Sequence, residues 1–127
     1  MQKTDEEISN IMYVCKTLKK IPGEENTILI GAEDKNITKV NLTQDNYSIS
    51  GTFQGHSAGI RSLDVSKDAQ TLASGCMDHS IRLWDYTTGK GRNILCGHQD
   101  VVTGTAFLNE NTLISTSWDL RILVWNF

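Results

Sequence analysis

The stretch Ser-Ile-Arg-Leu-Trp-Asp-Tyr-Thr-Thr-Gly-Lys occupies residues 80–90. Its Ile-Arg-Leu-Trp run at 81–84 alternates side chains of two kinds, which is the period of a strand with two different faces. The Thr-Thr-Gly-Lys-Gly run at 87–91 is typical of a hairpin turn. A tryptophan this close to a turn needs a partner for its ring and its indole N–H, and the rest of the chain must supply one.

The stretch has a second copy further along the chain. The Ile-Arg-Leu-Trp-Asp run at 81–85 aligns with Ile-Leu-Val-Trp-Asn at 122–126, and the two tryptophans are 41 residues apart. Three other matches accompany it: Gly-His at 55–56 and 97–98, Thr-Leu-Ala-Ser at 71–74 with Thr-Leu-Ile-Ser at 112–115, and Asp78 with Asp119. A weaker third copy lies at 26–41, where Asp34 precedes Val40 as Asp78 precedes Trp84. The chain is therefore built from a repeat that occurs almost three times.

Each repeat shows the signals of short strands. Apolar alternations separated by Gly, Asn, Asp and Lys predict strands at 10–16, 26–32, 36–42, 47–53, 59–65, 70–76, 80–85, 92–96, 101–107, 111–117 and 120–126. No stretch keeps a helical period for ten residues. The sequence predicts an all-β fold with four antiparallel strands per repeat.

A repeat near 40 residues, with Gly-His early and Trp-Asp late, resembles the WD-repeat family of β-propellers. The resemblance implies four-stranded blades at about 10–53, 54–96 and 97–127, after a polar segment at 1–9, with the last blade lacking its fourth strand. Propellers close with roughly 4–8 blades. Three blades would therefore form an incomplete propeller, completed by missing sequence or by another chain, or an open arc in a larger assembly.

The resemblance also implies a buried polar set in two of the blades. Its members would be His56, Ser74, Asp78 and Trp84 in the second blade, and His98, Ser115, Asp119 and Trp125 in the third. In such a set the carboxylate accepts from N–H groups and the imidazole, the imidazole meets the hydroxyl, and the hydroxyl meets the indole N–H. Trp84 is predicted to close that chain. Ile30 and Val40 stand at the matching positions of the first blade, where the set is expected to be absent.

Two chemical alternatives use the same residue types. Ser, His and Asp form hydrolase triads, but here the constellation occurs twice and a tryptophan caps the serine, so no enzyme activity is expected. Cys76-x-x-His79 and Cys96-x-His98 offer ligand types that zinc accepts. However, His98 has a role in the polar set and Cys76 matches Ser117 of the next repeat, so no metal and no cofactor are expected.

Composition limits the classes of partner. With 12 Lys+Arg against 15 Asp+Glu, the net charge of −3 predicts no direct nucleic acid binding and no binding to an anionic membrane. The three lysines at 16, 19 and 20 are interpreted as a solvated strand edge or loop. No apolar run approaches the roughly 20 residues of a membrane span. The first ten residues have no signal-peptide pattern, which favours the cytoplasm or nucleus.

The predicted function is a non-catalytic scaffold for protein–protein interaction or complex assembly. The alternative is a purely architectural propeller fragment, completed by another chain or missing sequence in a large ribonucleoprotein or ciliary-type machine. A third possibility, peptide recognition at a central channel, would need a closed ring.

Two surfaces are predicted to meet partners. The residue before each turn aspartate, and two residues early on the inner strands, should share one rim: Glu33, Met77, Trp118, Arg61 and Thr103. The competing interpretation is that Trp118 folds back over its own turn. The second surface is the edge of the last strand, Leu120, Arg121, Ile122, Leu123, Val124, Trp125 and Asn126. Unpaired backbone groups beside a nearly unbroken apolar run predict that a strand from outside residues 1–127 adds there.

Overall fold

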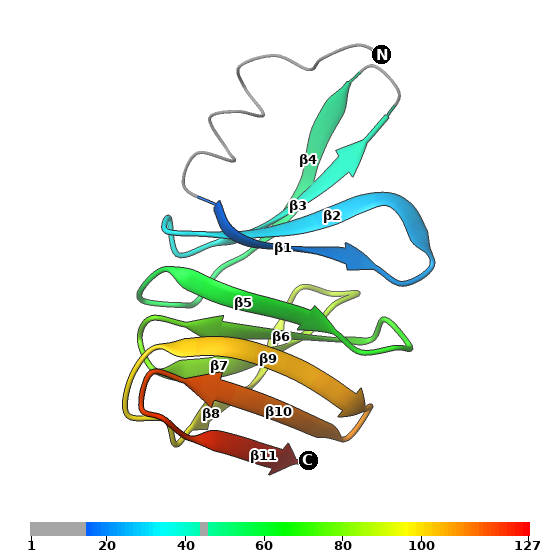
Figure 1. Ribbon diagram of the computed structural model, residues 1–127. Helices are drawn as coiled ribbons and strands as arrows, with labels where there is room; N and C mark the ends of the chain where they lie inside the picture. Colours follow the sequence, from blue (N-terminus) through cyan, green and yellow to red (C-terminus); the bar gives the residue numbers. More distant parts are fainter. Residues whose placement is uncertain (1–14, 44–45) are drawn as a thin grey trace.

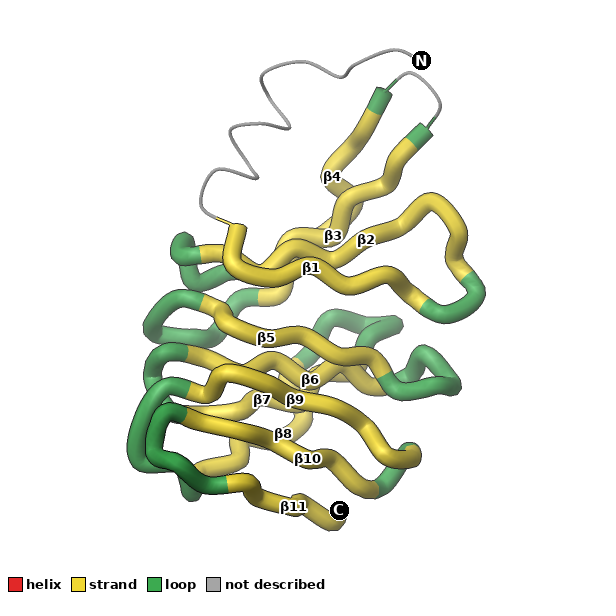
Figure 2. The backbone as a smooth tube through the Cα atoms, in the orientation of Figure 1, coloured by secondary structure: helices red, strands yellow, loops and turns green. Residues whose placement is uncertain are grey.

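The computed structural model describes residues 15–43 and 46–127, which form three antiparallel sheets stacked along the chain (Figures 1 and 2). Blade 1 contains β1 (Cys15–Ile21), β2 (Glu24–Ala32), β3 (Ile37–Leu42) and β4 (Tyr47–Phe53). Blade 2 contains β5 (Ile60–Val65), β6 (Thr71–Cys76), β7 (Ser80–Asp85) and β8 (Gly91–Cys96). Blade 3 contains β9 (Val102–Asn109), β10 (Thr112–Ser117) and β11 (Ile122–Asn126). The predicted all-β fold is confirmed.

Within each sheet, strands that follow one another in sequence lie side by side. The orders are β1-β2-β3-β4, β5-β6-β7-β8 and β11-β10-β9. Blades 1 and 2 therefore have four strands, and blade 3 has three among the described residues. These residues contain no helix, and so no helix long and apolar enough to cross a membrane.

The predicted strand bounds need correction at both ends of the described chain. The strand expected to end at residue 16 continues to Ile21 as β1 (Cys15–Ile21), and residues 10–14 of its expected range lie outside the described part of the chain. The strand expected at 120–126 begins at Ile122, because the backbone of Leu120 is left-handed (φ 68°) and cannot continue a strand. Leu120 and Arg121 thus belong to a turn rather than to the strand edge.

The same tight turn joins the second and third strands of every blade. An aspartate opens it, and the next residue has left-handed backbone: φ is 73° at Lys35, 76° at His79 and 68° at Leu120. The aspartate carboxylate accepts the N–H two residues further on, from Asn36 at 3.0 Å, Ser80 at 2.9 Å and Arg121 at 2.9 Å. Aspartate suits this position because its short carboxylate reaches that N–H group.

The inner strands β1, β5 and β9 stack on one another and carry most of the contact between blades (Figure 1). Lys19 in β1 forms an ion pair with Asp64 in β5, with Nζ and Oδ1 2.9 Å apart. The other oxygen of Asp64 accepts the backbone N–H of Phe107 in β9 at 2.7 Å. Lys16 pairs with Glu33 at 3.0 Å. The lysines at 16 and 19 therefore lie on an edge strand and are partly exposed, as interpreted, and that strand also packs on the next blade.

Two apolar cores fill the spaces between the sheets. The core between blades 1 and 2 includes Leu29, Ile37, Phe53, Ile60, Leu72 and Trp84. The core between blades 2 and 3 includes Ala73, Ile81, Leu83, Val102 and Leu113, with Phe107 and Trp125 packed against it. The ring of Phe53 meets that of Trp84 edge to face, with centroids 5.7 Å apart. Each blade thus buries one face against each neighbour that it has.

Candidate functional site

The polar residues predicted for blade 2 lie together between its strands. The Ser74 hydroxyl, on β6, accepts the indole N–H of Trp84 on β7 at 2.8 Å and lies 2.6 Å from Nε2 of His56. Ser74 is fully buried, and Trp84 and His56 are 2% and 6% exposed. The partner that the tryptophan of residues 80–90 requires is therefore the Ser74 hydroxyl.

Asp78 is bound mainly by two serines, Ser57 and Ser80, both of which sequence reasoning missed. One carboxylate oxygen accepts the N–H and hydroxyl of Ser57, at 3.2 and 3.0 Å, and the other accepts from Ser80. Burial would raise the pKa of Asp78, but the hydrogen bonds from Ser80 and Ser57 outweigh it and hold that pKa well below its usual value. The Asp-x-Ser spacing of Asp78 and Ser80 is a turn signal from which this contact could have been found.

His56 is held as a neutral imidazole. Its Nδ1 lies 3.5 Å from Asp78 and has no hydrogen-bond partner. Burial lowers the pKa of His56 from 6.5 to about 4, although the nearby carboxylate opposes that shift. A neutral ring can accept the Ser74 hydroxyl proton at Nε2, so the hydroxyl donates to His56 and accepts from Trp84.

Blade 3 repeats the arrangement with a shorter histidine–aspartate contact. Nδ1 of His98 lies 2.8 Å from Asp119, Nε2 lies 2.7 Å from the Ser115 hydroxyl, and that hydroxyl accepts the indole N–H of Trp125 at 2.8 Å. A carboxylate only accepts, so Nδ1 donates to Asp119. Burial would raise the pKa of Asp119, but the N–H of Gln99 and the imidazole lower it to about 2.

The matching positions in blade 1 hold apolar residues. Ile30 and Val40 are each 2% exposed, and Asp34 is exposed and accepts the N–H of Asn36. Blade 1 therefore forms through apolar packing where its neighbours use polar sets.

These sets are poorly suited to hydrolysis. The two serines are fully buried, and each hydroxyl is already engaged by an imidazole and an indole. A nucleophilic serine must reach its substrate beside free oxyanion donors.

The structure brings together a different set of potential metal ligands from the cysteines and histidines that the sequence suggests. His56, Cys76 and Asp78 each place one ligand atom within 4.8 Å of the others. Burial raises the pKa of the Cys76 thiol to about 12, which opposes the thiolate that zinc binds. The Cys76 sulfur instead donates to the Ala58 carbonyl at 3.3 Å and accepts the Asp78 N–H at 3.4 Å. In blade 3 the hydroxyl of Ser117 accepts the Asp119 N–H in the same way at 3.1 Å. The Cys76 thiol therefore makes the turn hydrogen bond that a hydroxyl makes in blade 3.

The five predicted rim residues lie around the turns at one end of the blades. Trp118 is 53% exposed, and the guanidinium carbon of Arg61 lies 5.2 Å from the centre of its ring. The ring thus pairs with an arginine of the neighbouring blade. Met77 is half-buried, Glu33 is exposed, and both lie beside Gly59. Thr103 contacts Thr116, with the two hydroxyls 3.0 Å apart.

The family model "WD domain, G-beta repeat" matches residues 47–85 and 89–126, which together make up more than half of the chain. The chain belongs to the WD-repeat family. Proteins of this family and fold are generally non-catalytic scaffolds for protein interaction.

Several WD-repeat relatives match most of the chain. WD repeat and FYVE domain-containing protein 1 of Mus musculus is 35% identical over 99 residues, covering 76% of this chain and 24% of the relative. Nuclear distribution protein PAC1 of Komagataella phaffii is 33% identical over 105 residues, covering 73% and 21%. A ribosome biogenesis protein WDR12 homolog of Drosophila mojavensis is 30% identical over 89 residues, covering 58% and 21%. The chain therefore spans less than a quarter of the length of each of these relatives.

The fold is similar to that of solved WD-repeat domains. The structure of U3-55K superposes with a TM-score of 0.79 and 27% identity, covering 89% of this chain and 36% of that one. The RRP9 WD40 repeats give the same TM-score and identity, with 89% and 35% covered. The three blades are thus equivalent to about a third of a solved WD-repeat chain.

Proposed function

We propose that this WD-repeat chain is a non-catalytic scaffold that binds a protein partner at the rim formed by Glu33, Arg61, Met77, Thr103 and Trp118. The observation that carries the proposal is the half-exposed indole of Trp118, held against Arg61. Tryptophan and arginine are the residues most enriched among binding hot spots. The names of two relatives, a nuclear distribution protein and a ribosome biogenesis protein, support a cytoplasmic or nuclear setting.

The rim is fixed before a partner arrives, which lowers the entropic cost of binding. The backbone N–H of Trp118 donates to the Val101 carbonyl at 3.0 Å, and that of Met77 donates to the Gly59 carbonyl at 2.9 Å. The side chain of Glu33 is tied to Lys16. A partner with an apolar group for the indole and an acidic group for Arg61 would match this surface.

Comparison of two single variants tests the rim. Ile94 on β8 is exposed to the same fraction as Trp118, 53%, and lies away from the turns, so Ile94→Ala is the matched control. Proteins captured from a cell extract by the wild type and by Ile94→Ala, but not by Trp118→Ala, would be assayed again as purified proteins. Direct binding that falls at least tenfold in Trp118→Ala alone is the expected result. Equal binding by all three forms would rule out the rim as the anchor.

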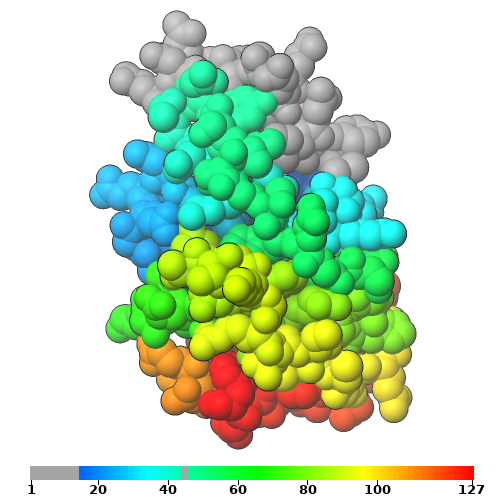
Figure 3. All heavy atoms as spheres, turned by 180° about the vertical axis from the view of Figure 1, so that it is seen from behind, coloured from blue at the N-terminus to red at the C-terminus, as the bar shows by residue number. Residues whose placement is uncertain are grey.

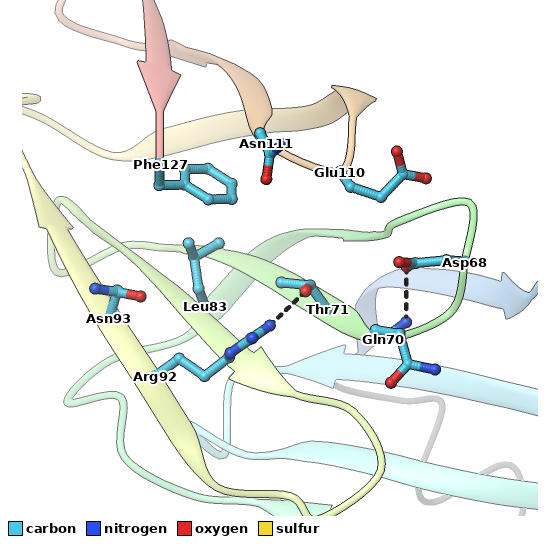
Figure 4. A pocket seen from close by; sticks show the side chains of 9 residues that line it. All are labelled: Asp68, Gln70, Thr71, Leu83, Arg92, Asn93, Glu110, Asn111 and Phe127. Carbon is cyan, nitrogen blue, oxygen red and sulfur yellow. Dashed lines mark hydrogen bonds between the residues drawn. The ribbon is translucent and has the colours of Figure 1, made fainter.

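A second proposal concerns the edge of β11. Two blades have a fourth strand and blade 3 has none in the described residues, so β11 offers unpaired N–H and C=O groups. A cavity of about 630 Å³ lies beyond the C-terminal end of β11, lined by Phe127 and by Leu83 and Asn93 of blade 2 (Figure 4). Seen from behind, the side chains of β8 lie next to the C-terminal segment (Figure 3). A strand from another chain, or from sequence beyond residues 1–127, would pair with β11.

Amide hydrogen exchange tests strand addition. The matched control is β7, which occupies the same place in blade 2 and is paired on both sides. In the assembled complex, the amides of 122–126 should be protected as well as those of 80–85. Fast exchange at 122–126 in that complex would mean that no strand is added there. The architectural alternative requires this pairing but not the rim, so the two tests separate the two functions.

A further inference from the structure

Neighbouring blades lock together through a β-branched side chain that sits over a glycine. Ile60 begins β5 and lies over Gly31 of blade 1, where an added Cβ would stand 2.6 Å from Ile60 Cγ2. Val102 begins β9 and covers Gly75 of blade 2, where an added Cβ would stand 2.6 Å from Val102 Cγ1. Both covering side chains are fully buried. We call the position of Ile60 and Val102 the knob, and that of Gly31 and Gly75 the socket.

The socket position of blade 3 is filled. The strand registers identify the corresponding pairs: Thr17 with Gly31, Ser62 with Gly75, and Gly104 with Thr116. Blades 1 and 2 have the hydroxyl residue on the inner strand and the glycine on the second strand, whereas blade 3 has them exchanged. The Thr116 hydroxyl lies over Gly104, 2.8 Å from where a Cβ on that glycine would stand.

The face of blade 3 that carries Thr116 corresponds to the face of blade 2 that blade 3 covers. Ile81 and Leu83 are 0% and 1% exposed where blade 3 covers blade 2. Ile122 and Val124, at the same register positions of blade 3, are 70% and 57% exposed. Solvent therefore reaches an apolar face that is covered in both other blades.

The contact that Asp64 makes with Phe107 across the earlier interface has no equivalent on this face. Ala106 pairs with Ile114 as Asp64 pairs with Ala73, so an alanine stands where blade 2 has the acceptor for Phe107. Ala106, Ile114 and Val124 form an apolar row across the three strands. Recognition of this face must depend on apolar shape rather than on an inner-strand hydrogen bond.

We propose that the free face of blade 3 receives a further WD-type blade whose knob residue is small: glycine, alanine or serine. A blade is the expected occupant because the equivalent faces of blades 1 and 2 are each covered by the next blade. An isoleucine or valine knob, as at Ile60 and Val102, would meet the Thr116 side chain where earlier knobs meet a bare glycine. Overlap of this kind forces neighbouring groups to shift, which weakens packing. This inference goes beyond the rim and the β11 edge, because it concerns the face of the sheet.

An extended chain tests the inference. Residues 1–126 are followed by a second copy of residues 86–127, which supplies a fourth strand to blade 3 and a fourth blade. Trp125-Asn126 corresponds to Trp84-Asp85, so the added segment continues the repeat in register. Its knob is the second copy of Val102, which faces Thr116. Four forms are compared: the extended chain itself, Val102→Ala in the second copy, Thr116→Gly in the first copy, and both changes together.

With Thr116 in place, Val102→Ala in the second copy should raise the denaturation midpoint of the fourth blade and slow amide exchange at 122–124. With Thr116→Gly, the form that keeps the valine knob should have the higher denaturation midpoint. The two changes should be coupled by at least about fivefold in the unfolding equilibrium constant. If the valine and alanine knobs over Thr116 gave equal denaturation midpoints, or if the valine knob gave the higher one, the proposal would be overturned.

The 127-residue chain provides a second test that needs no added blade. The double change Ser62→Gly, Gly75→Thr gives blade 2 the arrangement of blade 3 beneath the existing knob Val102. It should lower the denaturation midpoint, and adding Val102→Ala should recover part of that loss. If Val102→Ala lowers the midpoint as much in the exchanged background as in the wild type, the proposal is wrong. Neither test involves Trp118 or a bound partner, so failure here leaves the proposed rim intact.

Discussion

The ammonium group of Lys19 in blade 1 lies 2.9 Å from a carboxylate oxygen of Asp64 in blade 2. Because the second oxygen of Asp64 accepts the Phe107 N–H of blade 3, one side chain of 13% exposure connects three blades. An ion pair and a charge-assisted hydrogen bond meet in this carboxylate. The stacking of blades is therefore specified by a polar contact as well as by apolar burial.

Asp64→Ala should destabilise the chain more than Lys19→Ala. The aspartate change leaves the Phe107 N–H unpaired, at a cost of about 1.5–3 kcal/mol. The lysine is 40% exposed, so the lost ion pair should cost under about 1 kcal/mol. Chemical denaturation of both variants measures the difference. Asp64→Asn, which keeps an acceptor oxygen, is the control and should lie near Lys19→Ala.

Asp78→Ala should lower the free energy of unfolding by about 2–4 kcal/mol, because it leaves the N–H groups of Ser57 and Ser80 without their acceptor. Asp34→Ala removes an exposed carboxylate that binds one N–H, and should cost much less. Urea denaturation of both variants decides this prediction. Equal losses would mean that the polar set contributes no more than an isolated turn aspartate.

Stability should fall as the pH drops from 6.5 to 4. The pKa of His56 is 6.5 when the chain is unfolded and about 4 when it is folded, so the unfolded state binds more protons in this window. The contribution of His56 is fully present above pH 6.5, and its loss by pH 4 amounts to about 3 kcal/mol. Stability measured across this range should lose much of its slope in His56→Gln. An unchanged slope in His56→Gln would refute the assignment.

Leu120→Gly should stabilise the chain by roughly 0.5 kcal/mol, because leucine pays for a left-handed backbone that glycine adopts freely. Leu120 has φ 68° and is 93% exposed, so the change removes almost no packing. Thermal denaturation measures the gain. Leu108→Gly, at an exposed strand residue, should instead be destabilising, and a loss in both variants would contradict the argument.

The sequence predicts those parts of the molecule that repeat. The polar sets are implied by the resemblance to the WD-repeat family, whose motif positions are matched in two copies, so the contacts of Ser74 with His56 and Trp84 are expected from that resemblance. The first strand extends beyond its predicted end at residue 16 because Lys19 has a partner in another blade, Asp64, which no pattern within the first repeat reveals. Two features could not be predicted from the repeat pattern: the contact of Arg61 with Trp118, and the exchanged positions of Gly104 and Thr116. Both depend on how one blade meets another, which the spacing of residues within a single repeat does not determine.

The concentration of inter-blade contacts on β1, β5 and β9 has a mechanical consequence. Those strands form a closely packed spine, pinned at Asp64, while β4 and β8 diverge from it and are bridged by long side chains such as Phe53. We therefore expect the stack of blades to resist bending most along β1, β5 and β9, where neighbouring blades are in closest contact, and least at the outer strands β4 and β8.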